Sequence, residues 1–403
     1  MSGKEPLWTS NFVRIWIINL GLCIWGFMLN APFPFYILEL GGNELIVGLT
    51  AGGFAIASLI MRPLAGWILD KKSRSWITIW GIALLILISL LLMLVPILGV
   101  AVFLRIISGP VLSGAHTASA TNACDTIPQN RFGEGIGYLG LGNSLATALG
   151  PALGLAIIAG LGFRELFTVS IAVLVLAALI VRGFKFKKIE RTGSPEGRER
   201  IKLTSLFNAD ALPASVVMLF ASAPFGAVSV FIALYGEQYN LGHGAVFFIL
   251  VAVGTGSMRL LSGRLADKKG ERPMVAAGNS SFFLALVLLL FNSGACYYIS
   301  GLLFGIGFGV TIPALNAMAM RIIPPEKRGS AASTFHGAYD VSSGLGGLIA
   351  GVLVTYWGYR PMFGTFCVFV VISSLVYQLW ASKKPSAFEA YQRSRSEDMG
   401  ESE

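Results

Sequence analysis

The chain has 403 residues, of which 55% are hydrophobic and 13% are charged, and its formal net charge is +9. Soluble domains average about 45–50% apolar and about 25% charged residues, so a single water-exposed globule is excluded and lipid is the expected surrounding. No phosphate-binding loop or hydrolase motif is present in the sequence, which argues against an ATP-driven pump or an enzyme. The four cysteines are scattered singly, so we expect no metal site and no cofactor.

Apolar stretches of roughly 20 residues, enough to cross a bilayer, recur along the whole chain. The first six lie near residues 12–38, 45–68, 76–95, 99–121, 136–160 and 166–182. The second six lie near residues 213–235, 245–265, 274–291, 297–320, 333–355 and 361–380. The sequence therefore predicts an all-α membrane protein with twelve transmembrane helices. The expected parts are an N-terminal segment 1–10, a bundle 11–182, a linker 183–210, a second bundle 211–381 and a tail 382–403.

Lys and Arg gather on one side of these spans, most densely in the linker. The positive-inside rule places that side, with both termini, in the cytoplasm, so we expect a protein of the plasma membrane, the inner membrane of a bacterium. The net positive charge therefore indicates the orientation of the chain in the membrane, and nucleic acid is not an expected partner. We interpret the linker as a flexible connection, with docking to anionic lipid headgroups as the alternative. A monomer surrounded by membrane lipids is expected.

A segment of the first half, 66–74, returns as 263–272, displaced by 197 residues (263 − 66). The same displacement carries Pro128 and Arg131 onto Pro325 and Arg328. A repeat of this length indicates two copies of one unit, and two like halves in so apolar a chain favour a secondary transporter with its site between them. The motif residues are Gly66, Asp70, Lys71 and Arg74 in the first copy and Gly263, Asp267, Lys268 and Arg272 in the second, with Arg272 one residue further along (272 − 74 = 198).

These segments resemble the loop signature of the major facilitator superfamily, G-x-x-x-D-[RK]-x-G-[RK]-[RK], although Ser73 replaces the second glycine in the first copy. The resemblance implies two six-helix bundles related by a pseudo-two-fold axis, and it implies that the motifs gate the transporter from short cytoplasmic loops. We expect Asp125, at the cytoplasmic end of the fourth span, to pair with Arg62, Arg74 or another loop base. The resemblance implies that such pairs lock the outward-open state.

The fourth span carries Arg105, and an arginine inside lipid costs about 2.5–3.5 kcal/mol on insertion scales. It should therefore face the bundle interior, with His116 three turns further along on the same face. Arg105 and Gly109 resemble the family's R-x-x-x-G motif, which is associated with proton transfer. The alternative is a structural arginine that donates to backbone carbonyls.

In the fifth span Gly150, Pro151 and Gly154 resemble the antiporter motif of the drug–proton antiporter branch, with Ala146 and Leu155 as two departures from it. Small residues permit close helix packing. Pro151 is expected to kink the helix and so to provide a place where the two halves rock.

Asp340 in the eleventh span is the clearest acid inside an apolar segment, and His336 precedes it by one turn. An intramembrane acid beside an ionisable histidine suggests a proton relay. The alternative starts from Asn143, the repeat counterpart of Asp340 (340 − 197), which lies on the packing face of its helix. On that interpretation Asp340 belongs to an interface network between the halves.

Polar residues that share helix faces are candidates for the substrate cavity. In the first span Pro32 and Pro34 should break the helix beyond Asn30, and in the tenth Gly305 and Gly309 align with Asn316. The candidate cavity residues are Asn19, Asn30, Tyr36, His116, Asn143 and Asn316. The first span has no deep acid, although some drug–proton antiporters of the family carry one there.

The predicted function is alternating-access transport of a small molecule, with proton-coupled efflux as a multidrug or metabolite exporter favoured. The alternatives are a proton-coupled symporter or an uncoupled facilitator for a sugar, siderophore or organic anion. A non-transporting membrane sensor is a further alternative, and it would require a sizeable partner domain.

Overall fold

The structure, a computed structural model, describes residues 6–71, 74–128, 131–184, 211–269, 271–321 and 328–383. Only the backbone is described at 62–71, 74, 75, 133, 260–269, 320, 321, 328–330, 332, 333 and 383. These residues form thirteen α-helices and one 3-10 helix, with no strand among the described ranges. They divide into two compact units, 1–193 and 194–403.

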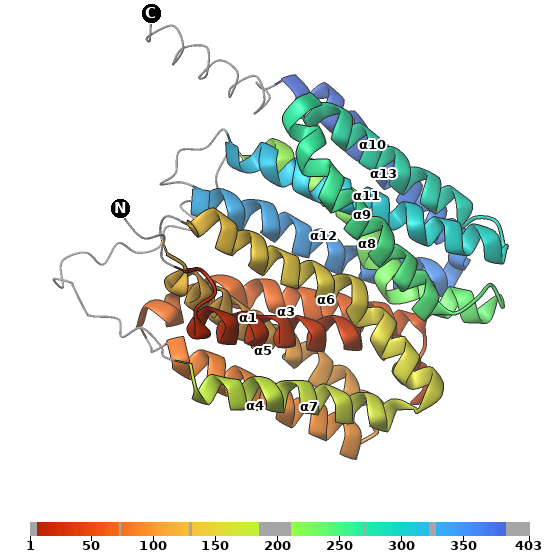
Figure 1. Cartoon of the computed structure of the whole chain (residues 1–403). Coiled ribbons are helices and arrows are strands. Elements are labelled where there is room, and N and C mark those ends of the chain that lie inside the picture. The colour runs from red at the N-terminus through yellow and green to blue at the C-terminus, as the bar shows by residue number, and fades with distance from the viewer. Residues whose placement is uncertain are drawn as a thin grey trace, which may run out of the picture. The chain divides into compact units, whose positions relative to one another are not determined.

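The first unit contains six long helices and one short one (Figure 1). They are α1 (Ser10–Asn30), α2 (Phe33–Glu39), α3 (Glu44–Lys71), α4 (Arg74–Leu94), α5 (Leu98–Thr126), α6 (Phe132–Gly160) and α7 (Phe163–Arg182). Thr9 caps α1, because its hydroxyl accepts a hydrogen bond of 3.1 Å from the Phe12 amide. The main packing pairs are α3 with α5, α1 with α6, and α4 with both α5 and α7.

The second unit repeats this plan with six long helices and a terminal 3-10 turn. They are α8 (Leu212–Gln238), α9 (Gly244–Lys269), α10 (Glu271–Leu288), α11 (Gly294–Arg321), α12 (Arg328–Trp357), α13 (Tyr359–Leu379) and η5 (Ala381–Lys383). Here α9 packs on α11, α8 on α12, and α10 on both α11 and α13. Each pair corresponds to a pair of the first unit, so the sequence repeat is also a repeat of helix packing.

Ten helices of the described chain are long and apolar enough to cross a membrane, and α9 contributes a shorter apolar stretch, Gly244–Arg259. The predicted all-α membrane fold of two six-helix bundles is confirmed. The first expected span, 12–38, is divided into α1 and α2 because Pro32 and Pro34 interrupt it, as predicted. Residues 185–210 of the predicted linker, 183–210, lie outside the described residues, and the limits predicted for the five parts of the chain stay a prediction.

The two repeated motifs were expected in short loops, and this expectation is wrong for most of their length. Helix α3 continues to Lys71 and α9 continues to Lys269, so Gly66 to Lys71 and Gly263 to Lys269 are helical. No proline interrupts either segment, and lysines in a last turn interact favourably with the negative end of the helix dipole. These effects offset the roughly 1 kcal/mol penalty of an internal glycine.

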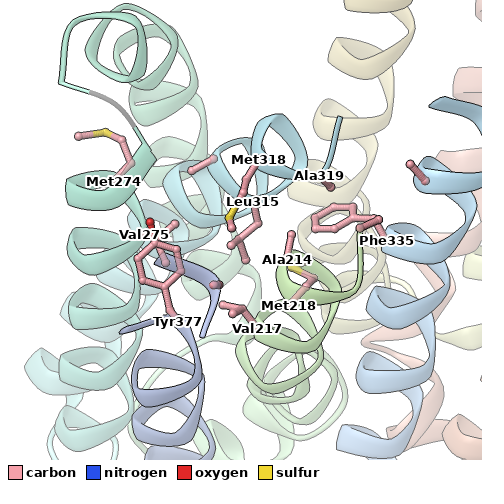
Figure 2. Packing of buried hydrophobic residues seen from close by; sticks show 14 of the residues in the cluster. Ala214, Val217, Met218, Met274, Val275, Leu315, Met318, Ala319, Phe335 and Tyr377 are labelled. Carbon is pink, nitrogen blue, oxygen red and sulfur yellow. The ribbon is translucent and has the colours of Figure 1, made fainter. Parts of the chain in front are cut away.

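An apolar cluster joins one end of the second unit (Figure 2). It forms where α8, α10 and α12 begin and where α11 and α13 end. Its labelled members are Ala214, Val217, Met218, Met274, Val275, Leu315, Met318, Ala319, Phe335 and Tyr377. Because the cluster draws on five helices, it fixes the relative placement of those helices within the unit.

Candidate functional site

A tyrosine cluster joins helices at one end of the first unit and includes Tyr36, one of the predicted cavity residues. Its hydroxyl donates a hydrogen bond of 2.7 Å to the Leu92 carbonyl of α4. Its ring lies 5.0 Å from the Phe163 ring and 5.2 Å from the Phe167 ring of α7. Tyr36 therefore joins three helices, which is a structural role.

The second unit has the same arrangement around Tyr235. The Tyr235 hydroxyl donates a hydrogen bond of 2.8 Å to the Leu289 carbonyl. Its ring lies 5.3 Å from the Tyr359 ring and 5.0 Å from the Phe363 ring of α13. The last helix of each unit also begins after a glycine in the left-handed region, Gly162 at φ +104° and Gly358 at φ +82°. Glycine is favoured at both positions because it adopts such angles without strain.

Arg105 is buried in the first unit, with 4% of its surface exposed. Its Nη2 donates to Asn30 Oδ1 at 3.3 Å, so the predicted cavity residue Asn30 and the predicted coupling residue Arg105 are in contact. The guanidinium carbon lies 4.6 Å from the centroid of the Phe54 ring and 5.3 Å from that of Phe33. Cations are attracted to aromatic faces, more strongly when both groups are desolvated.

The spacing of Arg105 and Gly109 has a direct structural cause. A Cβ atom at Gly109 would lie 2.6 Å from the Ser58 hydroxyl oxygen and within contact of the Phe54 carbonyl, both on α3. Only glycine lets α3 approach α5 this closely, and that approach brings the Phe54 ring over the guanidinium of the preceding turn. The glycine of the R-x-x-x-G pattern thus allows Phe54 of α3 to contact the arginine.

A polar strip continues from Arg105 along α5. The hydroxyls of Ser113 and Ser119 are buried and have no hydrogen-bond partner within the described part of the chain. His116 lies between them and is half-buried, three turns from Arg105 as predicted. Asp125 is exposed near the end of the helix, while its expected partners Arg62 and Arg74 have side chains outside the description.

The antiporter-like residues of α6 pack against α1 of the same unit. A Cβ at Gly150 would lie 2.7 Å from Phe27 Cβ, and one at Gly154 would lie 2.8 Å from Pro32 Cγ and inside contact distance of the Met28 carbonyl oxygen. Pro151 lies within the helix between them. The glycines thus allow a close α1–α6 crossing.

The same crossing contains two further predicted residues. Asn143 on α6 accepts a hydrogen bond of 3.2 Å from the Cys23 thiol on α1. Asn19, one turn earlier on α1, is buried. In the second unit the equivalent crossing of α8 and α12 has Gly346 against the Ala223 carbonyl and Gly226 against the Ser343 carbonyl.

The remaining predicted residues of the second unit lie on α11 and α12. Asp340 is half-buried and His336 is exposed, one turn apart on α12. Tyr339 beside Asp340 contacts Phe225 of α8, at 6.1 Å between ring centroids, and Phe225 stacks on Phe308 at 4.6 Å. The acid therefore follows a residue that takes part in an aromatic cluster.

Asn316 on α11 is half-buried, but the two glycines aligned with it do not line a cavity as expected. A Cβ at Gly309 would lie 2.8 Å from the Thr255 carbonyl oxygen, and one at Gly305 would overlap the Val251 carbonyl. Both glycines allow close packing of α9 against α11, and the Thr255 hydroxyl adds a hydrogen bond of 3.1 Å to the Gly305 carbonyl.

Comparison with known proteins identifies the family. A sequence model described as Major Facilitator Superfamily matches residues 15–291 and 244–397. The chain belongs to the major facilitator superfamily. It is a transporter and an integral membrane protein of that family, and not an enzyme.

Two relatives cover nearly the whole chain. The staphylopine export protein of Staphylococcus aureus is 22% identical over 93% of this chain and 96% of its own length. The multi-drug resistance efflux pump PmrA of Streptococcus pneumoniae is 28% identical over 92% and 96%. A solved structure of a mutant of the nucleoside transporter NupG has a TM-score of 0.76 at 13% identity, covering 91% of this chain and 99% of that one. This last likeness concerns the fold alone.

For most residues of the two repeated motifs, the structure describes the backbone and not the side chain. This applies to Gly66, Asp70, Lys71, Arg74, Gly263, Asp267 and Lys268, as it does to Arg62. Arg272 is described, and its Nη2 donates a hydrogen bond of 2.6 Å to the Ser382 carbonyl just beyond α13. The contact joins the start of α10 to the end of the last helix.

Sequence reasoning missed Phe54 as a neighbour of Arg105. Phe54 lies in an apolar run of α3 with nothing in its spacing to separate it from lipid-facing residues. The available signal was Gly109, because a glycine one turn after a buried arginine marks a close approach by another helix.

Proposed function

We propose that this major facilitator is a proton-coupled exporter of a small molecule in the plasma membrane, with both termini in the cytoplasm. Two relatives that align along nearly the whole chain bear names of exporters. The observation that carries the proposal is Asp340, a half-buried carboxyl about 18 Å along α12 from its start at Arg328. Protonation changes the charge of a carboxyl at such depth, so it can bias the two states of an alternating-access cycle.

The membrane potential is large enough to drive this coupling. One charge moving through 100 mV supplies about 2.3 kcal/mol, which corresponds to a roughly fifty-fold concentration ratio. We assign proton binding to Asp340, with His336 one turn away as the relay partner. Arg105 remains charged throughout because a guanidinium is not deprotonated in proteins, so its part in coupling is electrostatic. We assign gating to the two repeated motifs and Asp125.

The test begins with a ligand, found by a thermal-shift screen of the purified chain against a diverse compound panel. Proteoliposomes with a pH-sensitive dye inside then report ligand-dependent proton movement. We expect protons to move opposite to the ligand, and we expect Asp340→Asn to abolish proton-coupled flux while ligand exchange persists. Glu237→Gln, which alters an exposed acid of the same unit, should leave the flux unchanged.

Undiminished uphill transport by the Asp340→Asn variant would reject the assignment. Protons that move with the ligand would indicate a symporter, and flux indifferent to a collapsed pH gradient would indicate an uncoupled facilitator.

A further inference from the structure

The charge of Arg105 has no counter-charge paired with it among the described residues of its unit. The residue is 96% buried (100 − 4), and no carboxylate in the described ranges forms an ion pair with it. A buried charge without a partner is strongly unfavourable unless a hydrogen-bonded counter-ion is supplied. The two phenyl rings and the Asn30 oxygen stabilise the cation only in part.

The hydrogen-bonding capacity of the guanidinium is also unfilled. Its hydrogen bond to Asn30 is long, at 3.3 Å between Nη2 and Oδ1. Buried Nη1 has no hydrogen-bond partner among the described residues, although buried polar atoms in proteins usually have one. A purely structural arginine would donate this group to a carbonyl, so Nη1 is available to an acceptor that enters from outside the unit.

We propose that Arg105 and Asn30 form an oxyanion subsite, and that the transported molecule carries a carboxylate which binds there. The guanidinium fork matches a carboxylate in charge and in planar geometry, and such pairs are among the strongest hydrogen bonds in proteins. Asn30 Oδ1 accepts from Nη2 and so holds one side of the fork in place. This inference rests on the proposed function, because it names the substrate class of the same transporter.

The flanking rings restrict what surrounds the carboxylate. Phe33 and Phe54 contact the guanidinium, so atoms attached to the carboxylate enter apolar, aromatic surroundings. An aryl or alkyl carboxylate fits this combination, and a permanent cation does not. The subsite lies where α1 ends and Arg105 stands on the eighth residue of α5, within a single unit of the chain.

The experiment uses purified full-length protein and benzoate as the probe, with benzamide as its neutral isostere and sodium chloride at equal ionic strength as the salt control. We expect benzoate, and not benzamide, to raise the melting temperature of the wild type in a saturable manner. We expect Arg105→Gln to weaken the apparent affinity for benzoate roughly tenfold or more. Arg164→Gln, which alters an exposed arginine of the same unit, should change it less than about twofold.

A second variant keeps the test informative if Arg105→Gln fails to fold. Asn30→Asp places a carboxylate of nearly the same shape beside Nη2, so it supplies the missing counter-charge from within the protein. We expect this variant to melt at a higher temperature than the wild type without ligand and to lose the response to benzoate. A benzoate response that persists in Asn30→Asp overturns the proposal, as do equal effects of benzoate and benzamide on the wild type.

The outcome is separable from that of the coupling test. A benzoate response that requires Arg105, together with no proton movement by the wild type, supports the subsite and rejects proton-coupled export. Proton-coupled export that Arg105→Gln leaves intact, with no benzoate response in the wild type, rejects the subsite alone.

Discussion

Substituting Gly154 by alanine tests whether α6 packs against α1 as closely as the structure shows. The added Cβ would lie 2.8 Å from Pro32 Cγ and inside contact distance of the Met28 carbonyl oxygen. Neither neighbour can move aside easily, because Met28 O is a backbone atom and Pro32 is fixed at the junction of α1 and α2. Helix α6 must therefore shift away from α1.

The expected size of the effect follows from a matched pair of variants on one helix. Gly137 is also on α6, and a Cβ there would have no atom within 4 Å. Both substitutions gain up to about 1 kcal/mol of helix propensity, so the propensity term cancels between them. The difference is the overpacking penalty at Gly154, about 1–3 kcal/mol. For a unit of this size it corresponds to a gap in melting temperature of roughly 2–12 °C.

The assay is thermal unfolding of the purified full-length variants, followed by tryptophan fluorescence. Trp16 and Trp25 both lie on α1, and Trp16 donates a hydrogen bond of 2.9 Å from Nε1 to the Tyr138 carbonyl of α6. The signal therefore includes residues on both sides of the crossing. If Gly154→Ala melts at or above the temperature of Gly137→Ala, the close approach of the two helices is wrong.

Two further predictions address the helix ends and the gating motif. Tyr36→Phe and Tyr235→Phe should each lower the free energy of unfolding by about 1 kcal/mol or more, because each leaves a carbonyl without its donor. Denaturation of both variants checks this, with exposed Tyr356→Phe as the control, and equal stability of all three would contradict it. Asp70→Asn should slow interconversion of the transport states without weakening ligand binding, as measured by turnover in proteoliposomes and by thermal-shift titration. An unchanged turnover would count against gating.

The overall architecture was predictable because hydropathy and duplication are long-range signals that survive in a single sequence. The long helices could be placed from apolar stretches, and the break beyond Asn30 from two prolines. The helical ends of α3 and α9 were not predicted, since a Gly–Asp–Lys–Lys run is compatible with a loop or with the last turns of a helix. The packing of neighbouring helices around the segment decides between a loop and a helix end, and the motif residues alone carry no information on that packing.

Site contacts were less predictable than helices because they depend on how helices cross. Periodicity aligned Asn19 with Asn30, and Arg105 with His116, but it gave no information on which helix each face meets. Periodicity alone predicted that Gly305 and Gly309 line the cavity, although they pack against α9. It also gave no warning that Phe54 would contact Arg105. Glycines inside apolar spans are better interpreted first as points of close helix packing.

The matching tyrosine clusters suggest that each unit can hold its helices together when the two units are made as separate polypeptides. One tyrosine hydroxyl and a few aromatic rings join α2, α4 and α7 in the first unit, and they join α8, the end of α10 and α13 in the second. Within the described residues, the hydrogen bonds and ring contacts given above for each cluster come from one unit. A gene cut within the linker should therefore yield two polypeptides that each insert and hold their helices together, and their reassembly would then become a separate, measurable event.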